Sequence, residues 1–213
     1  MKELNSKVKI IAVFDFDGTI IKGDTMFIFH KLLNNKISRI LNYIKLFPFY
    51  VMYIFKIINL IYLKEKFYRI IIKPVLISNP KKNFDKILSD QLSTLIRNKI
   101  KINAKKRIEW HLRNDHKVII ISASPRQLIE KVANDLGVEL IATETNLQEL
   151  IKKNSPNYKF CFTSKNCKGK EKVIRLKNYI KDSLDDYIIY AYGDSEGDRE
   201  LLQFADYSYL NNL

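Results

Sequence analysis

The chain has 213 residues, of which 46% are hydrophobic, and its 37 Lys and Arg against 23 Asp and Glu give a formal net charge of +14. This length and apolar content suffice for one domain, or for one domain with an insertion, and exclude intrinsic disorder of the whole chain. The two cysteines, Cys161 and Cys167, lack metal-ligand spacing, which excludes a disulfide scaffold and a zinc module. The start of the chain reaches an Asp pair before a signal-peptide core could form, so we expect a cytoplasmic protein.

The first predicted element is a strand over residues 8–14, a β-branched and aromatic run that ends in Asp15-Phe-Asp17-Gly18. A run that is apolar on both faces and is stopped by a Gly turn fits a buried parallel strand. Two carboxylates therefore lie at the carboxyl end of this strand.

Residues 24–100 differ from the rest of the chain in pattern and in charge. Residues 31–82 carry eleven basic side chains and one acid, a concentration that a uniform codon bias would not produce. This segment therefore reads as a mostly helical insertion, with Pro74 and Pro80 in a connection between helices. The expected helices are residues 26–33 with Asp24 as N-cap, residues 37–63 as one or two long helices, and residues 84–97.

Residues 40–63 are nearly all apolar, and on one continuous helix their polar side chains Asn42, Lys45, Lys56 and Asn59 share a sector of about 100°. Such a helix either packs inside the insertion or lies in a membrane interface with its lysines reaching lipid phosphates. A transmembrane span is disfavoured, because Pro48 interrupts the stretch and each central Lys costs roughly 2.5 to 3.5 kcal/mol on insertion.

The rest of the chain alternates between strands and helices of about ten residues. This alternation predicts an α/β fold: a doubly wound, Rossmann-like parallel sheet whose ligands bind beyond the carboxyl ends of the strands. The expected strands are 118–121, 138–142, 187–192 and 207–210, and the expected helices are 107–114, 126–136 with Gly137 as C-cap, 171–180 and 198–204.

Polar clusters follow the predicted strands or precede a predicted helix, and the set is more informative than any member. The clusters are Asp15-X-Asp17-Gly18-Thr19, Ser122-Ala123-Ser124-Pro125, Cys167-Lys168-Gly169-Lys170 and Gly193-Asp194-Ser195-Glu196-Gly197-Asp198. Their order resembles the haloacid dehalogenase superfamily of phosphohydrolases, and IIISASP, NCKGKEKVIRLK and YGDSEGDRELL resemble its phosphoserine-phosphatase-like branch. The insertion is similar to a C1-type cap. The resemblance implies a catalytic core of residues 1–23 and 101–213 and a helical cap of residues 24–100.

The resemblance also implies roles in phosphomonoester hydrolysis, which needs a nucleophile, a proton donor and cations. Asp15 would attack phosphorus to form an aspartyl phosphate, and Asp17 would act as general acid and then as general base. Ser122 and the main chain at Ala123 and Gly18 would bind phosphoryl oxygens, helped by the helix that begins near Pro125. We expect Ser124 to be an N-cap.

Several converging carboxylates would repel a phosphate without a cation, so Mg²⁺ is the expected cofactor. By the resemblance, it would be held by the carboxylates of Asp15 and Asp194 and by the main-chain carbonyl of Asp17. Asp198, one helical turn after Asp194, would support the metal site or the catalytic lysine. The family pattern favours Lys168 as that lysine over Lys170, with Lys170 and Lys172 solvated in the first turns of the next helix.

The substrate depends on the cap. Phosphoserine phosphatases hold their amino acid with a cap Glu, which Asp24 matches by position, and an Arg, for which no match is found. The basic charge and apolar face resemble caps of phosphatidylglycerophosphatase-type members. We favour a small soluble phosphomonoester over a lipid phosphate cleaved by a peripheral enzyme at the membrane surface. A non-enzymatic scaffold that binds nucleic acid or membrane is least favoured, because every catalytic position is filled.

Overall fold

The computed structural model describes residues 9–78, 85–146, 161–180 and 186–213. The strands form a sheet in the order β3-β2-β1-β4-β5, in which every pair is parallel. They are β1 (Lys9–Phe14), β2 (Lys117–Pro125), β3 (Glu139–Thr143), β4 (Tyr187–Gly193) and β5 (Tyr207–Leu210). The predicted Rossmann-like α/β fold is confirmed, and so are all five strands to within a few residues. Val8, which we placed in the first strand, lies outside the described residues.

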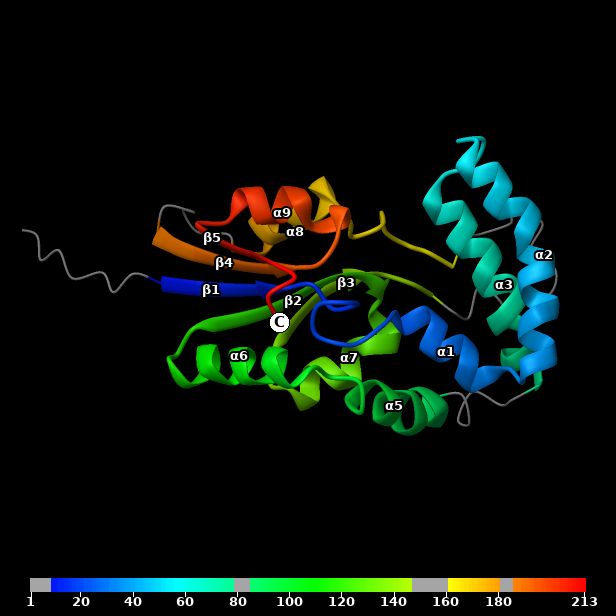
Figure 1. Cartoon of the computed structure of the whole chain (residues 1–213), viewed down its shortest axis with the longest axis horizontal. Coiled ribbons are helices and arrows are strands. Elements are labelled where there is room, and N and C mark those ends of the chain that lie inside the picture. Colours follow the sequence, from blue (N-terminus) through cyan, green and yellow to red (C-terminus); the bar gives the residue numbers. More distant parts are fainter. Residues whose placement is uncertain (1–8, 79–84, 147–160, 181–185) are drawn as a thin grey trace, which may run out of the picture.

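Helices cover both faces of the sheet (Figure 1). The lower layer holds α6 (Ile102–Arg113) and α7 (Arg126–Asp135), and the upper layer holds α8 (Lys170–Ile180) and α9 (Arg199–Phe204), which follows the short 3₁₀ turn η4 (Glu196–Asp198). Alternate side chains of β1 join different cores, Ala12 and Phe14 on the α6–α7 side and Ile11 and Val13 on the other. This double burial explains why β1 is apolar at consecutive positions.

The central strand β1 is where the winding of the chain reverses. From β1 the chain runs to β2 and β3 on one side and then to β4 and β5 on the other. Phe14 is in register with Ile120 of β2 and Tyr192 of β4, and the amide of Asp15 donates to the carbonyl of Tyr192 at 2.9 Å. The carboxyl ends of these three strands therefore meet at the edge where such sheets bind their ligands.

The insertion supplies three helices beyond the end of β1 (Figure 1). The carboxylate of Asp24 caps α1 as expected, accepting from the amides of Met26 at 2.8 Å and Phe27 at 3.2 Å. The later helices η1 and α5 pack against both α1 and α7, and α5 lies in the lower layer (Figure 1). The elements are α1 (Thr25–Leu33), α2 (Lys36–Ile54), α3 (Leu60–Ser78), the π-helix η1 (Ile87–Leu92) and α5 (Ser93–Arg97).

One expectation for the insertion is wrong, because Pro74 lies inside α3 and not in a connection. Of the one or two helices expected over residues 37–63, the structure has two, since α2 ends at Ile54, Lys56 has a positive φ of 57° and α3 begins at Leu60. Asn42, one of the four polar side chains expected to share a sector on one continuous helix, is buried and donates to Asn34 Oδ1 at 3.2 Å. Pro80 and Phe84 lie outside the described residues.

Polar contacts of α3 tie this helix to the edge of the sheet. Lys64 Nζ donates to the carbonyl of Ala123 at 2.9 Å and to Asn166 Oδ1 at 2.7 Å. The buried Glu65 accepts from the amide of Cys161 at 2.8 Å. Among the helices that the structure describes, none combines the length and apolarity needed to cross a bilayer.

Candidate active site

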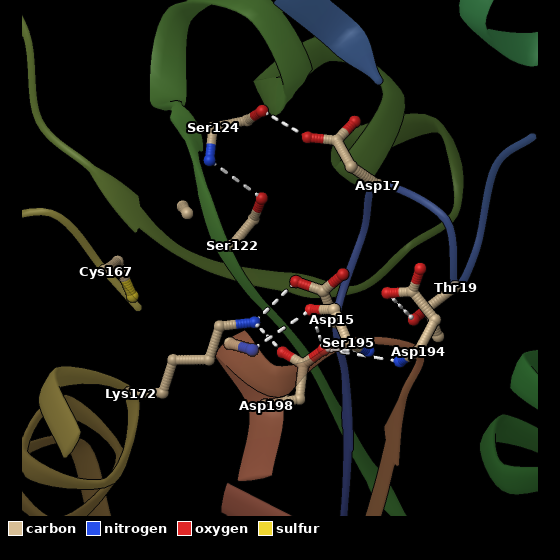
Figure 2. A network of polar contacts seen from close by, with 12 residues as sticks. Asp15, Asp17, Thr19, Ser122, Ser124, Cys167, Lys172, Asp194, Ser195 and Asp198 are labelled. Atoms are coloured by element: carbon tan, nitrogen blue, oxygen red, sulfur yellow. Dashed lines mark hydrogen bonds and ion pairs between the residues drawn. The ribbon is translucent and has the colours of Figure 1, made fainter. Parts of the chain in front are cut away.

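A buried ion pair lies at the end of β1. Lys172, only 1% exposed, extends from the first turn of α8 and its Nζ lies 2.5 Å from Asp15 Oδ1 and 2.5 Å from Asp198 Oδ1 (Figure 2). Burial alone lowers the pKa of Lys172, but the two carboxylates outweigh burial and the pKa lies above its ordinary value. Lys172 is therefore a fixed cation beside Asp15.

The expectation that Lys172 is solvated is wrong. The structure places Lys172 against Asp15, whereas Lys168 is exposed at the rim of the same cavity, beside Gly197. Lys172, Leu176 and Ile180 recur every four residues on the buried face of α8. This four-residue spacing in the sequence indicates that Lys172 points inward. The prediction from the family motif did not use it.

Asp15 combines burial with a mixed electrostatic environment. Burial, the largest influence, raises the pKa of its carboxyl to about 7; Lys172 lowers this pKa, and the neighbouring Asp198 raises it. A buried carboxylate in such a setting is stabilised by added positive charge.

Asp17 points away from Asp15, toward β2 and the start of α1 (Figure 2). Its Oδ1 accepts from the amide and hydroxyl of Thr25, at 2.7 and 2.5 Å, and its Oδ2 accepts from the hydroxyl of Ser124. Burial, followed by the charge of Asp24, raises the pKa of Asp17 to about 6. Ser124 is thus an orienting partner of Asp17, and not the N-cap that we expected, because Pro125 occupies the N-cap position.

Asp194 closes the other side of the cavity. Its Oδ1 accepts from Thr19 Oγ1 at 3.3 Å, and its pKa is raised by burial and by Asp198. Gly18, with φ of 79°, leaves room for this carboxylate, since a Cβ there would lie 2.0 Å from Asp194 Oδ2. The amide of Gly18 donates to the carbonyl of Gly23 at 3.1 Å, so this amide is engaged within the loop instead of facing a phosphate.

Asp198 holds the loop that carries Asp194. Its Oδ2 accepts from the amides of Asp194 and Ser195, at 3.3 and 3.2 Å, and from the Ser195 hydroxyl at 3.0 Å, while its Oδ1 faces Lys172. Gly193 permits this approach, because a Cβ at that position would lie 2.6 Å from the Cβ of Asp198. Asp198 therefore contacts both Lys172 and the loop that carries Asp194.

The donor set fits a divalent cation. Asp15, Asp194 and Asp198 each offer a carboxylate oxygen, and these oxygens lie within 4.8 Å of one another. When all three are ionised, Lys172 balances only one of their charges. Hard oxygen ligands with excess negative charge suit Mg²⁺.

Ser122 and Ala123 line the cavity that holds these carboxylates. The Ser122 hydroxyl oxygen accepts from the amide of Ser124 at 3.0 Å, which leaves its own proton available as a donor. The Ala123 carbonyl accepts from Lys64 and from Thr143 Oγ1. The structure thus brings together Asp15, Asp17, Gly18, Ser122, Ala123, Lys168, Asp194 and Asp198 around one cavity of about 620 Å³.

Sequence reasoning missed Thr25, Lys64 and Asn166. Thr25 immediately follows the predicted N-cap, and a hydroxyl at a helix start is a weak signal because it is common there. Burial lowers the pKa of Lys64 to about 8, against the opposing charges of Asp24 and Asp17. No local pattern marked Lys64, since it was one of eleven bases in its segment.

Comparison with solved structures places the fold. A protein of unknown function from Bordetella pertussis Tohama I is similar with a TM-score of 0.74 and 17% identity, over 94% of this chain and 89% of that one. A phosphoserine phosphohydrolase-like protein from Francisella tularensis subsp. tularensis SCHU S4 has a TM-score of 0.56 and 17% identity, over 94% of both chains. A substrate-bound phosphoserine phosphatase complex has a TM-score of 0.55 and 14% identity, over 95% of this chain and 85% of that one. The three share the fold of this chain.

Sequence comparison identifies the family. Protein CicA of Caulobacter vibrioides, from strains NA1000 / CB15N and ATCC 19089 / CIP 103742 / CB 15, is 34% identical over 91 residues, which are 42% of this chain and 38% of CicA. The match thus spans well under half of that relative. The model of the haloacid dehalogenase-like hydrolase family matches residues 12–203, from the middle of β1 through most of α9. With the predicted motifs gathered at one edge of the predicted sheet, the chain belongs to the haloacid dehalogenase-like hydrolases.

Proposed function

We propose that the protein is a phosphomonoester phosphatase that works through an aspartyl phosphate on Asp15. The observation that carries the proposal is the buried contact of Asp15 with Lys172, inside a cavity that Asp17, Asp194 and Ser122 also line. Asp15 lines the cavity, and Lys172 favours the ionised form of its carboxyl, which a nucleophile requires.

In the first step, an oxygen of Asp15 forms a bond to phosphorus, and the bond between phosphorus and the substrate oxygen breaks. Asp17 gives its proton to the departing alcohol. A pKa near 6 leaves part of the Asp17 population protonated near neutral pH, which suits a general acid. Thr25 and Ser124 keep this carboxyl in place through three hydrogen bonds.

In the second step, Asp17 takes a proton from water, the water oxygen bonds to phosphorus, and the bond from phosphorus to Asp15 breaks. Inorganic phosphate leaves, and both carboxyl groups return to their starting states. Lys172 balances charge on Asp15 throughout, and the hydroxyl of Ser122 donates to a phosphoryl oxygen.

Mg²⁺ is the proposed cofactor, held by the carboxylates of Asp15 and Asp194 with the Asp17 carbonyl. When bound, it would neutralise charge on the phosphoryl group. Lys172 takes the role first expected of Lys168, because Lys172 touches Asp15 and Lys168 is exposed. The division into a core of residues 1–23 and 101–213 and a cap of residues 24–100, and a cytoplasmic location, stay predictions.

The substrate is a phosphorylated small molecule, for which a soluble phosphomonoester or a lipid phosphate remain the two candidates. The exposed apolar side chains of α2 favour keeping the second candidate. Nucleic-acid binding is not part of the proposal.

The test is hydrolysis of p-nitrophenyl phosphate with and without Mg²⁺, together with acid-quenched mass spectrometry to detect a phosphorylated Asp15. We expect Mg²⁺-dependent turnover that Asp15→Asn abolishes. Asp115→Asn is the matched control, because Asp115 is an exposed carboxylate in the turn before β2. Turnover that survives Asp15→Asn would contradict the proposal.

A further inference from the structure

A second cavity lies among the helices of the insertion and adjoins the active site. It has a volume of about 390 Å³, within the range of small-molecule sites. Its walls come from the start of α1, the middle of α2 and the first turns of α3, and almost all are apolar. The lining residues are Asp24, Met26, Phe27, Tyr43, Leu46, Phe47, Tyr50, Leu63, Lys64 and Phe67.

The two cavities share three lining residues. Asp24, Phe27 and Lys64 line both this cavity and the one that contains Asp15. Lys64 bridges to the carbonyl of Ala123, next to Ser122, so the charged end of the shared wall lies on the phosphate side. A molecule with its phosphate at Asp15 would have its other end directed toward the apolar cavity.

Part of the apolar wall of this cavity is exposed and is not covered by other side chains of the described residues. Phe47 is 64% exposed and Phe27, at the junction, is 52% exposed, although both contribute to the cavity. Leu46 and Phe67 lie deeper and give the cavity an apolar floor. Exposed apolar surface that adjoins a polar site is a common sign of a ligand with an apolar part and a polar part.

Resting on the proposed phosphatase activity, we propose that the substrate is a phosphomonoester of an apolar chain, whose chain occupies the α1–α3 cavity while its phosphate is attacked by Asp15. The chain could reach the enzyme as a monomer or from a lipid surface, and the chemistry recognised is the same. What the cavity selects is a flexible hydrocarbon of moderate length on the phosphate oxygen.

The experiment measures kcat/KM for n-alkyl phosphates from ethyl to octyl, each below its aggregation concentration and with Mg²⁺ present. Since burying one methylene is worth about 0.8 kcal/mol, kcat/KM should rise about threefold to fourfold per added methylene until the cavity is filled. A flat series, with p-nitrophenyl phosphate still hydrolysed, overturns the inference alone. Failure of every substrate, including p-nitrophenyl phosphate, overturns the proposed function.

A matched pair of variants locates the effect on α2. Phe47 lines the cavity, whereas Ile44, one helical turn before it, is equally exposed at 63% and lies outside the lining. Phe47→Asp should lower the octyl-to-ethyl ratio of kcat/KM by about tenfold or more, because the charge must be desolvated beside the chain. Ile44→Asp should keep the wild-type ratio. Tyr50→Ser is a second variant in the lining in case Phe47→Asp does not fold, as judged by circular dichroism.

A further assay with vesicles tests whether the hydrocarbon substrate reaches the enzyme as a monomer or from a lipid surface. Dodecyl phosphate is presented in phosphatidylcholine vesicles and compared with monomeric octyl phosphate. The proposal expects the gain with chain length for the monomeric substrates, and expects Phe47→Asp alone to reduce it. If the gain appears only with vesicles, and Phe47→Asp and Ile44→Asp lose it equally, α2 is a membrane-contacting face and the cavity proposal is overturned.

Discussion

The carboxyl edge of the sheet and the helix α2 differ in which side chains they bury and which they expose. At the edge, Asp15, Asp198 and Lys172 are buried and paired with one another. On α2, large apolar side chains such as Ile37 and Phe47 face solvent. Burying a charged group costs free energy unless an opposite charge or hydrogen bonds compensate for the lost water. Apolar side chains stay exposed where no protein group covers them. Under the proposed function, the paired charges at the edge would supply the chemistry and the exposed apolar side chains of α2 would supply surface for a ligand.

Removing the buried cation Lys172 should cause the largest loss of activity. Lys172→Met leaves Asp15 and Asp198 facing each other without compensation, and we expect kcat for p-nitrophenyl phosphate to fall by about 10²- to 10³-fold, as when a preorganised donor is lost. Lys168→Met, its control, should cost less than about tenfold, because Lys168 is exposed. Steady-state kinetics decides between them, with circular dichroism to confirm folding. A larger loss in Lys168→Met would return the catalytic role to that residue.

The helices α1–α3 contain both buried and exposed apolar side chains. The same substitution, Ile to Ala, can therefore be made at a buried and at an exposed position. Ile71 in α3 is 1% exposed and Ile37 in α2 is 71% exposed. Ile71→Ala should lower the free energy of unfolding by about 2 to 5 kcal/mol through the cavity that it leaves. Ile37→Ala should change it by less than about 0.5 kcal/mol. Urea unfolding measures both, and equal costs would show that the α2 face is packed in solution.

Lowering the pH should lower the free energy of unfolding, because of His111 beside the sheet. This histidine of α6 is fully buried, with Nε2 3.0 Å from the hydroxyl of Tyr192 and Nδ1 2.8 Å from His116 Nδ1. Burial, aided by His116 and Arg107, lowers the pKa of His111 to about 4 from its ordinary 6.5.

Between these values the unfolded chain binds more protons than the folded one, so the free energy of unfolding falls as the pH drops from about 6.5 to about 4. The loss at the lower end is on the order of 2 to 3 kcal/mol. Urea titrations at several pH values measure this slope. His111→Gln should be less stable at neutral pH but should lack this part of the slope, and an unchanged slope in the variant would assign the effect to other groups.

The smallest effect that we predict concerns two loop glycines beside the edge. Gly18 and Gly23 both have positive φ, 79° and 94°, but a Cβ would meet Asp194 only at Gly18 and would meet nothing within 4 Å at Gly23. Gly18→Ala should raise the Mg²⁺ concentration for half-maximal activity by about tenfold, because it displaces a proposed ligand. Gly23→Ala carries the backbone strain of about 1 kcal/mol without that shift. Equal Mg²⁺ titrations would contradict the assignment of Asp194.

Much of the edge could be predicted from local patterns. Strands that are apolar at consecutive positions and end in Asp or Ser indicated a parallel sheet, and the carboxyl ends of such strands converge. Asp24 as an N-cap was equally local, since its partners lie two and three residues away. The α1–α3 region was harder, because an almost wholly apolar segment has no dominant face. In α2 the polar residue Asn42 is buried, whereas the apolar residues Ile37 and Phe47 are exposed.

The sequence by itself determined the α/β order, and it placed Asp15, Asp17 and Asp194 just after predicted strands, because periodicity and turn chemistry act over a few residues. The roles of these carboxylates and of Asp198 were implied by the family resemblance, and they stay predictions. The four-residue spacing in α8 indicates only that Lys172 lies on a buried face, and the tertiary structure decided that this face meets Asp15, 157 positions away. The same holds for Ser124, whose partner Asp17 is 107 positions distant, and for the meeting of α1, α2 and α3 in one cavity. Those contacts depend on how buried surfaces and charges are matched across the whole fold, which no short stretch of the chain contains.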